Sequence, residues 1–141
     1  MPAPPHNGPV LVLPTNGSGT IGCWAHYWGA DLQSNKDALT KELVKQDIRV
    51  DGLDESAPSG AGICMFGEPT PELRVFLQTA SRAGRERIIA VAGDGQWANG
   101  SSSWELLEAG ASDVLVWSDP SRVARQVRAR FDRWLSVDQL I

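Results

Sequence analysis

The sequence predicts a three-layer α/β fold, in which a parallel sheet of five strands lies between two layers of helices. Three observations support this prediction. Short apolar runs alternate with amphipathic stretches, turn-forming residues separate them, and 141 residues with 42% hydrophobic content suit one domain with one core. Because crossovers between parallel strands are right-handed, helices cover both faces of the sheet, and we expect the flavodoxin-like strand order 2-1-3-4-5.

The expected elements follow one another along the chain with clear local signals. The strands are short, continuous apolar runs, as in strands that are buried on both faces. The second helix is the best marked, because Thr70 can cap it, Pro71 suits its first turn and Gly84 can end it. The expected strands are residues 9–14, 48–53, 61–67, 87–93 and 113–117, and the expected helices are residues 35–47, 70–84, 102–110 and 119–140.

The segment between the first expected strand and the first expected helix is longer than this fold requires, and its aromatic stretch, residues 23–32, can form an extra half-helix. The segment also contains Gly17, Gly19 and Gly22 in the spacing of dinucleotide-binding loops, which follow a strand and cradle phosphate at a helix N-terminus. In a chain with 14 glycines this spacing is weak, and we expect a flexible turn. The alternative is a small nucleotide- or flavin-binding protein that uses this loop.

Composition and charge exclude several classes of protein. The formal net charge of -4 argues against a protein that coats nucleic-acid backbones, so we expect no direct nucleic-acid partner. Cys23 and Cys64 form neither a disulfide framework nor a CxxC motif, which fits a reducing cytoplasm and no metal site. The Pro-rich start lacks the features of a signal peptide, and no apolar run approaches the roughly 18 residues of a membrane span, so we expect no membrane partner.

The last third of the chain resembles the receiver domains of two-component response regulators. In "RIIAVAGDGQ" and "SSSWELLEAGASDVLVWSDPSRVARQVRARF" a fourth strand, a helix ending in "EAGA", an Asp, an apolar fifth strand and a Pro-containing turn recur in the order typical of that family. The end "RARFDRWLSVDQLI" is similar to the segment that joins an N-terminal receiver to the ATPase module of sigma-54-dependent transcription activators. The resemblance implies a CheY-like fold with a disordered lead at 1–8, a receiver-like domain at 9–134 and the start of a linker helix at 135–141.

The residues that carry receiver chemistry are absent from the matching positions. In receivers, acids after strand one hold a divalent cation, an Asp ending strand three is phosphorylated, a hydroxyl side chain ends strand four and a Lys ends strand five. A phosphoryl group here would face neither a cation cage nor an ammonium group, so we expect a pseudo-receiver that is not phosphorylated, catalyses nothing and needs no cofactor. Glu68 can mimic the missing charge, although a solvated loop carboxylate is the simpler interpretation. The residues at these positions are Asn16, Phe66, Gly67, Ala92 and Trp117.

Two surfaces remain as candidate binding sites. Trp97, Trp104 and Trp117 fall around the ends of the last two strands, where they either line a ligand pocket or, as we expect, fill space in the core. In receivers the last strand and the two helices beside it commonly form the dimer. The resemblance therefore implies a homodimer, within a bacterial regulator whose downstream modules are an AAA+ ATPase and a DNA-binding domain. The implied dimer residues are Trp104, Glu108, Arg122 and Arg125.

Overall fold

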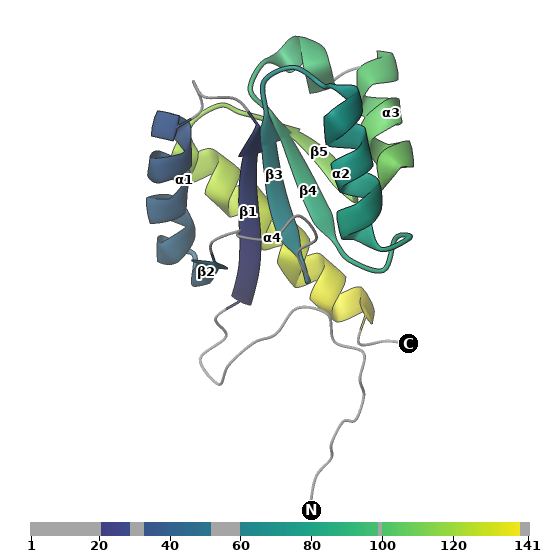
Figure 1. Cartoon of the computed structure of the whole chain (residues 1–141). Coiled ribbons are helices and arrows are strands. Elements are labelled where there is room, and N and C mark those ends of the chain that lie inside the picture. The colour runs from purple at the N-terminus through teal and green to yellow at the C-terminus, as the bar shows by residue number, and fades with distance from the viewer. Residues whose placement is uncertain (1–20, 29–32, 52–59, 99, 139–141) are drawn as a thin grey trace, which may run out of the picture.

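The computed structural model describes residues 21–28, 33–51, 60–98 and 100–138, and it confirms the parallel five-stranded sheet in the order β2-β1-β3-β4-β5 (Figure 1). The strands are β1 (Ile21–Trp28), β2 (Ile48–Asp51), β3 (Gly62–Phe66), β4 (Ile88–Ala92) and β5 (Asp113–Val116). The helices are α1 (Gln33–Lys45), α2 (Pro71–Ser81), α3 (Gly100–Ala109) and α4 (Pro120–Asp138), with a short 3-10 helix η2 (Gly95–Ala98) before α3.

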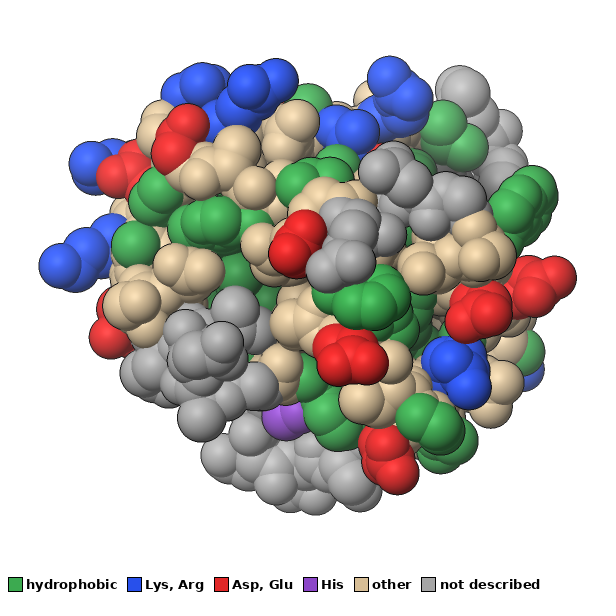
Figure 2. Space-filling view, turned by 90° about the horizontal axis from the view of Figure 1, so that it is seen from above, with side chains coloured by type: hydrophobic (Ala, Val, Ile, Leu, Met, Phe, Trp, Pro, Cys, Tyr) green, Lys and Arg blue, Asp and Glu red, His purple; other side chains and the backbone are tan. Residues whose placement is uncertain are grey.

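The helices form two layers. Helices α1 and α4 pack against each other on one face of the sheet, and α2 and α3 pack against each other on the opposite face (Figure 1). All pairings in the sheet are parallel, so the carboxyl ends of the strands meet at one end of the molecule, which is the upper end in Figure 1 and faces the viewer in Figure 2. No helix of the described residues is long and apolar enough to cross a membrane.

The expected position of the first strand is wrong. Strand β1 occupies Ile21–Trp28, inside the segment that was expected to contain a turn and an extra half-helix, whereas residues 1–20 lie outside the described part of the chain. Side chains alternate along β1: Cys23 and Ala25 face α1 and α4, and Trp24 faces α2. This alternation, together with the aromatic content that strands favour, lets a segment without an aliphatic run pair with both neighbouring strands.

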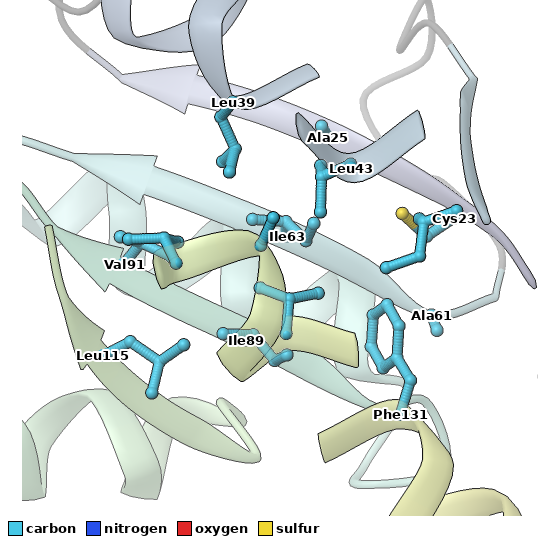
Figure 3. Close-up of a cluster of buried hydrophobic side chains, with 14 of the residues drawn as sticks. Cys23, Ala25, Leu39, Leu43, Ala61, Ile63, Ile89, Val91, Leu115 and Phe131 are labelled. Carbon is cyan, nitrogen blue, oxygen red and sulfur yellow. The ribbon is translucent and has the colours of Figure 1, made fainter. Parts of the chain in front are cut away.

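The core on the α1 and α4 face is mostly aliphatic. Figure 3 shows side chains of β1, β3, β4 and β5 meeting Leu39 and Leu43 of α1 and the ring of Phe131 of α4. Helix α4 presents Val123, Val127 and Phe131 as its apolar stripe, as the periodicity predicts, and all three are fully buried. Leu135 packs against the same cluster. Helix α4 runs without a break to Asp138, past residue 134, where the receiver-like domain was expected to end.

The core on the α2 and α3 face is more aromatic. The Trp24 and Phe76 rings meet edge to face at 5.7 Å between centroids, and both side chains are buried. The Trp24 indole lies directly over Gly62, where a Cβ atom would overlap the ring, and its Nε1 donates a hydrogen bond to the Gly60 carbonyl at 2.9 Å. Glycine at residue 62 is therefore required by the close approach of an indole to the β3 backbone.

Helix α2 begins as expected and ends earlier. Thr70 Oγ1 accepts a hydrogen bond from the Leu73 N–H at 3.1 Å, and Pro71 occupies the first turn. The helix ends at Ser81, because Arg82 and Ala83 already have left-handed backbones with φ of 51° and 61°. The expected end at Gly84 is therefore too late: Gly84 is the third residue of this left-handed turn.

Candidate functional site

The last residues of four strands form a level row at the carboxyl end of the sheet. Strand register places Trp28 beside Phe66, Phe66 beside Ala92, and Ala92 beside Val116. Backbone hydrogen bonds continue the row by one residue, from the Gly67 N–H to Trp28 O at 3.4 Å and from the Trp117 N–H to Ala92 O at 2.8 Å. We call this row the carboxyl rim, and its members are Trp28, Phe66, Ala92 and Val116 with the following Gly67, Gly93 and Trp117.

The rim corrects one expected site residue. Because β1 ends at Trp28, the residue of β1 that lies level with Phe66 is Trp28 and not Asn16, which is outside the described residues. Receivers hold their cation-binding acids after strand one, which in this chain means the residues that directly follow Trp28. The sequence directly after Trp28 includes Asp31, which also lies outside the described residues.

The other candidate residues of the degenerate site lie at or next to the rim. Phe66 and Ala92 are fully buried, and Trp117 is half-buried against the aliphatic core. Glu68, which directly follows Gly67, is exposed. Figure 2, which looks onto this end, shows hydrophobic and acidic side chains about the centre and Lys and Arg toward the periphery. Among the described residues no three His, Cys, Asp or Glu side chains come together as a metal site would require.

The glycine loop does not have the context that a phosphate loop needs. Gly22 lies inside β1, paired with Arg49 of β2, at the amino end of the sheet. A phosphate loop must leave the carboxyl end of a strand and enter a helix, whereas this glycine run leads into a strand. Gly17 and Gly19 are outside the described residues. The nucleotide- or flavin-binding alternative is therefore not supported, and Gly22 instead accommodates the Arg49 side chain, which a Cβ atom would overlap.

The three tryptophans that we expected to fill the core, or alternatively to line a pocket, are not brought together. Trp97 packs against the aromatic core on the α2 and α3 face, and Trp117 packs against the aliphatic core on the opposite face. Trp104 projects from α3 with 68% of its surface exposed. Because the sheet separates Trp97 from Trp117, the three indoles do not line one cavity.

Among the described residues, pKa values shift for His26, for Tyr27, whose pKa burial raises to about 12, and for two buried thiols. The His26 ring stacks on Phe76 at 5.1 Å and meets Trp28 edge to face at 5.0 Å. Burial, and secondarily the charge of Lys36, lower the pKa of His26 below its usual 6.5. Burial also raises the pKa of Cys23 to about 12 and raises that of Cys64, so both thiols stay protonated and unreactive at neutral pH.

A second candidate site lies on the flank of the sheet. Strand β5 is an edge strand, and a groove of about 370 Å³ runs beside it and α4. We call the area formed by the groove and the exposed side of α3 the α3–β5–α4 surface. It exposes Trp104, Leu107 and Val116 by 68%, 37% and 40% of their surfaces. The groove is lined by Val114, Leu115, Val116, Ser118, Arg122 and Gln126.

The charged side chains of this surface differ in whether they have a hydrogen-bond or ion-pair partner within the chain. Glu108 of α3 and Arg122 of α4 are exposed, and neither forms an ion pair within the described part of the chain. Arg125 donates a hydrogen bond to Ser121 Oγ at 2.6 Å, within α4. Glu108 and Arg122 are therefore free to pair with groups outside the chain.

The side chain of Asp113, the first residue of β5, bonds to one of the outward-facing N–H groups of this edge strand. The Trp117 N–H donates a hydrogen bond to Ala92 O of β4. Because successive residues of a parallel strand point their backbone N–H and C=O groups to opposite sides, those of Val114 and Val116 point away from β4, toward the open edge. The Val114 N–H donates to Asp113 Oδ1 at 2.8 Å, and Asp113 Oδ2 pairs with Arg130 Nε at 2.6 Å. A charged pair at this position discourages the addition of a further strand.

Comparison with known proteins identifies the fold. No protein-family model matches the sequence, and no curated protein sequence matches it significantly. The orphan response regulator HP1043 of H. pylori superposes with a TM-score of 0.54 at 10% identity, over 77% of this chain and 95% of that chain. The response regulator domain of Thermotoga maritima CheB superposes with a TM-score of 0.51 at 16% identity, over 86% of this chain and 98% of that chain. The chain therefore has the CheY-like, flavodoxin-like fold of receiver domains.

Proposed function

We propose that this protein is a response-regulator-like regulatory module that works without phosphorylation and signals through its α3–β5–α4 surface. The observation that carries this proposal is the carboxyl rim. By the resemblance, Phe66, which is fully buried, takes the position of the phosphorylated Asp, and Trp117 takes the position of the Lys. The proposed module catalyses no reaction and requires no cofactor.

Physical chemistry of phosphoryl transfer supports this proposal. An aspartyl phosphate forms when a carboxylate attacks a phosphoryl group whose charge is neutralised by a cation and an ammonium group. A phenyl ring has no nucleophilic atom, and an indole N–H cannot supply a positive charge. The described acids near the rim, Glu68 and Asp94, are both exposed to solvent and do not lie within the packed row.

The finer part of the proposal concerns the parent protein. We propose that the module serves a cytoplasmic, sigma-54-dependent transcriptional regulator, joined through α4 to an AAA+ ATPase and a DNA-binding module. Its support is the resemblance of residues 128–141 to the linker of such activators and the course of α4, a helix of 19 residues. Because Phe131 and Leu135 pack against the core, a change in that core would be transmitted along α4. A parent gene that encodes no P-loop and no helix-turn-helix beyond residue 141 would contradict this part.

The decisive test is phosphorylation itself. The purified chain is incubated with acetyl phosphate and Mg²⁺, and its intact mass is measured against a receiver of known activity treated in parallel. We expect no phosphoryl adduct on this chain and a clear adduct on the control. An adduct that is removed by hydroxylamine, and that peptide mapping places on Asp31, Glu68 or Asp94, would refute the proposal, because an acyl phosphate would then form at the rim.

A further inference from the structure

We infer that the apolar run at residues 9–14 pairs with the open edge of β2 as a sixth, antiparallel strand of the sheet. This run is the strand expected from the sequence that is not among the five strands of the sheet, and it lies outside the described residues. The inference goes beyond the proposed function, because β2 is the edge of the sheet opposite to β5 and the α3–β5–α4 surface.

The outer backbone groups of β2 are in position to receive a further strand. The Ile21 N–H of β1 donates to Asp47 O at 2.9 Å, and Ile21 lies level with Ile48. In a parallel pair this contact sets the alternation along β2, so Arg49 turns its N–H and C=O toward β1, and Ile48 and Val50 turn theirs outward. Two residues of an antiparallel strand, spaced by two, can bond all of these outward groups.

The charged side chains of β2 leave this edge clear. Arg49 leans over β1, because its guanidinium group occupies the space that a Cβ atom of Gly22 would overlap. Its Nε pairs with Asp51 Oδ1 at 3.1 Å. At the opposite edge of the sheet, by contrast, Asp113 Oδ1 accepts the outward N–H of Val114. An added strand is therefore less obstructed at β2 than at β5.

An exposed valine of α1 lies on the side of that helix where the added strand would run. Helix α1 packs on β2 and on α4 (Figure 1). Leu43 points into the core, the partly buried Glu42 lies on the flank toward α4, and Val44 lies on the opposite flank, about 100° around the helix from Leu43. Val44 exposes 60% of its surface. A sixth strand beyond β2 would bring apolar side chains to Val44 and remove it from water.

The run itself has the composition of a short edge strand. Residues 10–13, VLVL, place apolar side chains on both faces of a strand. Pro9 and Pro14 bound this run, and proline, which has no N–H, is confined in sheets to strand ends and edge strands. The residues between the two prolines equal β2 in length, since Ile48–Asp51 is a strand of 4 residues. The run therefore fits the outside of β2 better than the interior of a sheet.

The connection to β1 determines the direction of the added strand. Residues 15–20, TNGSGT, lead to Ile21, which lies at the amino end of the sheet, level with Ile48. An antiparallel strand beyond β2 would end at this same end of the sheet, two strand spacings or about 10 Å from β1. Six residues span up to about 20 Å, and Asn and Gly suit a turn past the start of β2. A parallel strand would need a crossover of roughly a dozen residues or more, so the antiparallel direction is the one that fits.

The experiment measures amide hydrogen exchange and nuclear Overhauser contacts by NMR on the full chain. We expect slow exchange at the Ile48 and Val50 amides, and backbone contacts between residues 10–13 and residues 48–50. The double variant Leu11→Asp, Val12→Asp places two carboxylates in the run, and aspartate is disfavoured in strands. We expect both amides to exchange at least about tenfold faster in this variant, while the chemical shifts of β4 show that the rest of the sheet is folded.

A matched control separates strand pairing from added charge. The double variant Ala3→Asp, His6→Asp adds the same two carboxylates outside the run, and both amides should stay as slow as in the wild type. Fast exchange at Ile48 and Val50 in the wild type, or equal exchange in the wild type and the Leu11→Asp, Val12→Asp variant, would overturn the inference. Contacts of residues 10–13 with another part of the chain would overturn it as well.

The same spectra distinguish the chain's own segment from that of a second copy. In a mixture of isotope-labelled and unlabelled chains, contacts between residues 10–13 and 48–50 should form within the labelled chain. Contacts that form only between labelled and unlabelled chains would overturn the inference, because the occupant of the edge would then belong to another molecule. None of these results depends on phosphorylation, so the proposed function is tested separately by its own assay.

Discussion

The carboxyl rim and the α3–β5–α4 surface differ in how far their side chains are already engaged within the chain. At the rim Phe66 and Ala92 are fully buried and Trp28 packs against the aromatic core. On the flank Trp104 is 68% exposed and the groove beside β5 is open. Both regions belong to a fold whose chemistry is normally expected at the carboxyl ends of the strands. This contrast supports the proposal that the rim carries no phosphoryl chemistry and that signalling uses the flank.

The largest expected effect comes from returning a carboxylate to the rim. Phe66→Asp introduces a carboxylate at the residue that the resemblance aligns with the phosphorylated Asp of receivers, and it places the charge in a fully buried site. We expect the free energy of unfolding to fall by about 4 kcal/mol, measured by urea denaturation, because an unpaired charge is buried and an aromatic side chain is lost.

Phe66→Leu is the matched control for this variant. Leucine keeps the site apolar at a somewhat smaller volume, so we expect a loss of only about 1 kcal/mol. If Phe66→Asp unfolds at the same urea concentration as Phe66→Leu, or accepts a phosphoryl group from acetyl phosphate, the rim is more open to water and ions than the packing implies, and its contrast with the flank disappears.

The part of the fold that sequence reasoning predicts well is the part where burial and periodicity agree. Strands β3 and β4 are continuous apolar runs, and every residue of both is buried. Strand β1 was missed because apolar content alone favours residues 9–14, whereas β1 combines Gly22 with aromatic side chains. The useful signal was the alternation of Trp24, His26 and Trp28, which places three large rings on one face of a strand.

The accuracy of the predicted site depends on the accuracy of the predicted strands, which was good for β3, β4 and β5 and poor for β1. Phe66, Ala92 and Trp117 lie together at the rim because β3, β4 and β5, which position them, were identified correctly. The cation-ligand position was assigned to Asn16, but it depends on where β1 ends. It therefore belongs to the residues directly after Trp28, which lie outside the described part of the chain. The groove beside β5 could not be predicted, since it arises from the packing of α4 against the sheet edge and not from any local pattern.

A smaller effect is expected on the flank, where polar contacts rather than packing maintain the edge. Asp113→Ala removes both the ion pair with Arg130 and the acceptor for the Val114 N–H. Because both partners of the ion pair are about one-third exposed, we expect the free energy of unfolding to fall by only about 1 kcal/mol. Aggregation at raised temperature, followed by light scattering, should increase, because the outward N–H of an edge strand is uncovered.

Arg130→Ala is the companion to this variant, since it breaks the ion pair but leaves the Asp113 carboxylate bonded to Val114. We expect a smaller loss of stability and no increase in light scattering. Equal aggregation by both variants would show that the ion pair, and not the closed edge, protects β5. The edge of β5 would then be protected by surface charge alone, as on an ordinary charged surface, and not by the bond between Asp113 and the Val114 N–H.

The smallest expected effect concerns His26, which lies two residues before the rim and stacks on Phe76 of α2. Burial and Lys36 lower its pKa in the folded chain, so the unfolded chain binds the proton more readily. The contribution of His26 to stability is therefore complete above the unfolded pKa of 6.5 and decreases as the pH falls below it. Between about pH 7.5 and about pH 5.5 we expect the urea midpoint of the wild type to fall slightly more than that of His26→Gln.

Equal falls of the urea midpoint in the two proteins would mean that His26 is as well hydrated as a free imidazole. In that case the aromatic packing beneath the rim would be open to water on its β1 side, and the difference between rim and flank would be one of degree.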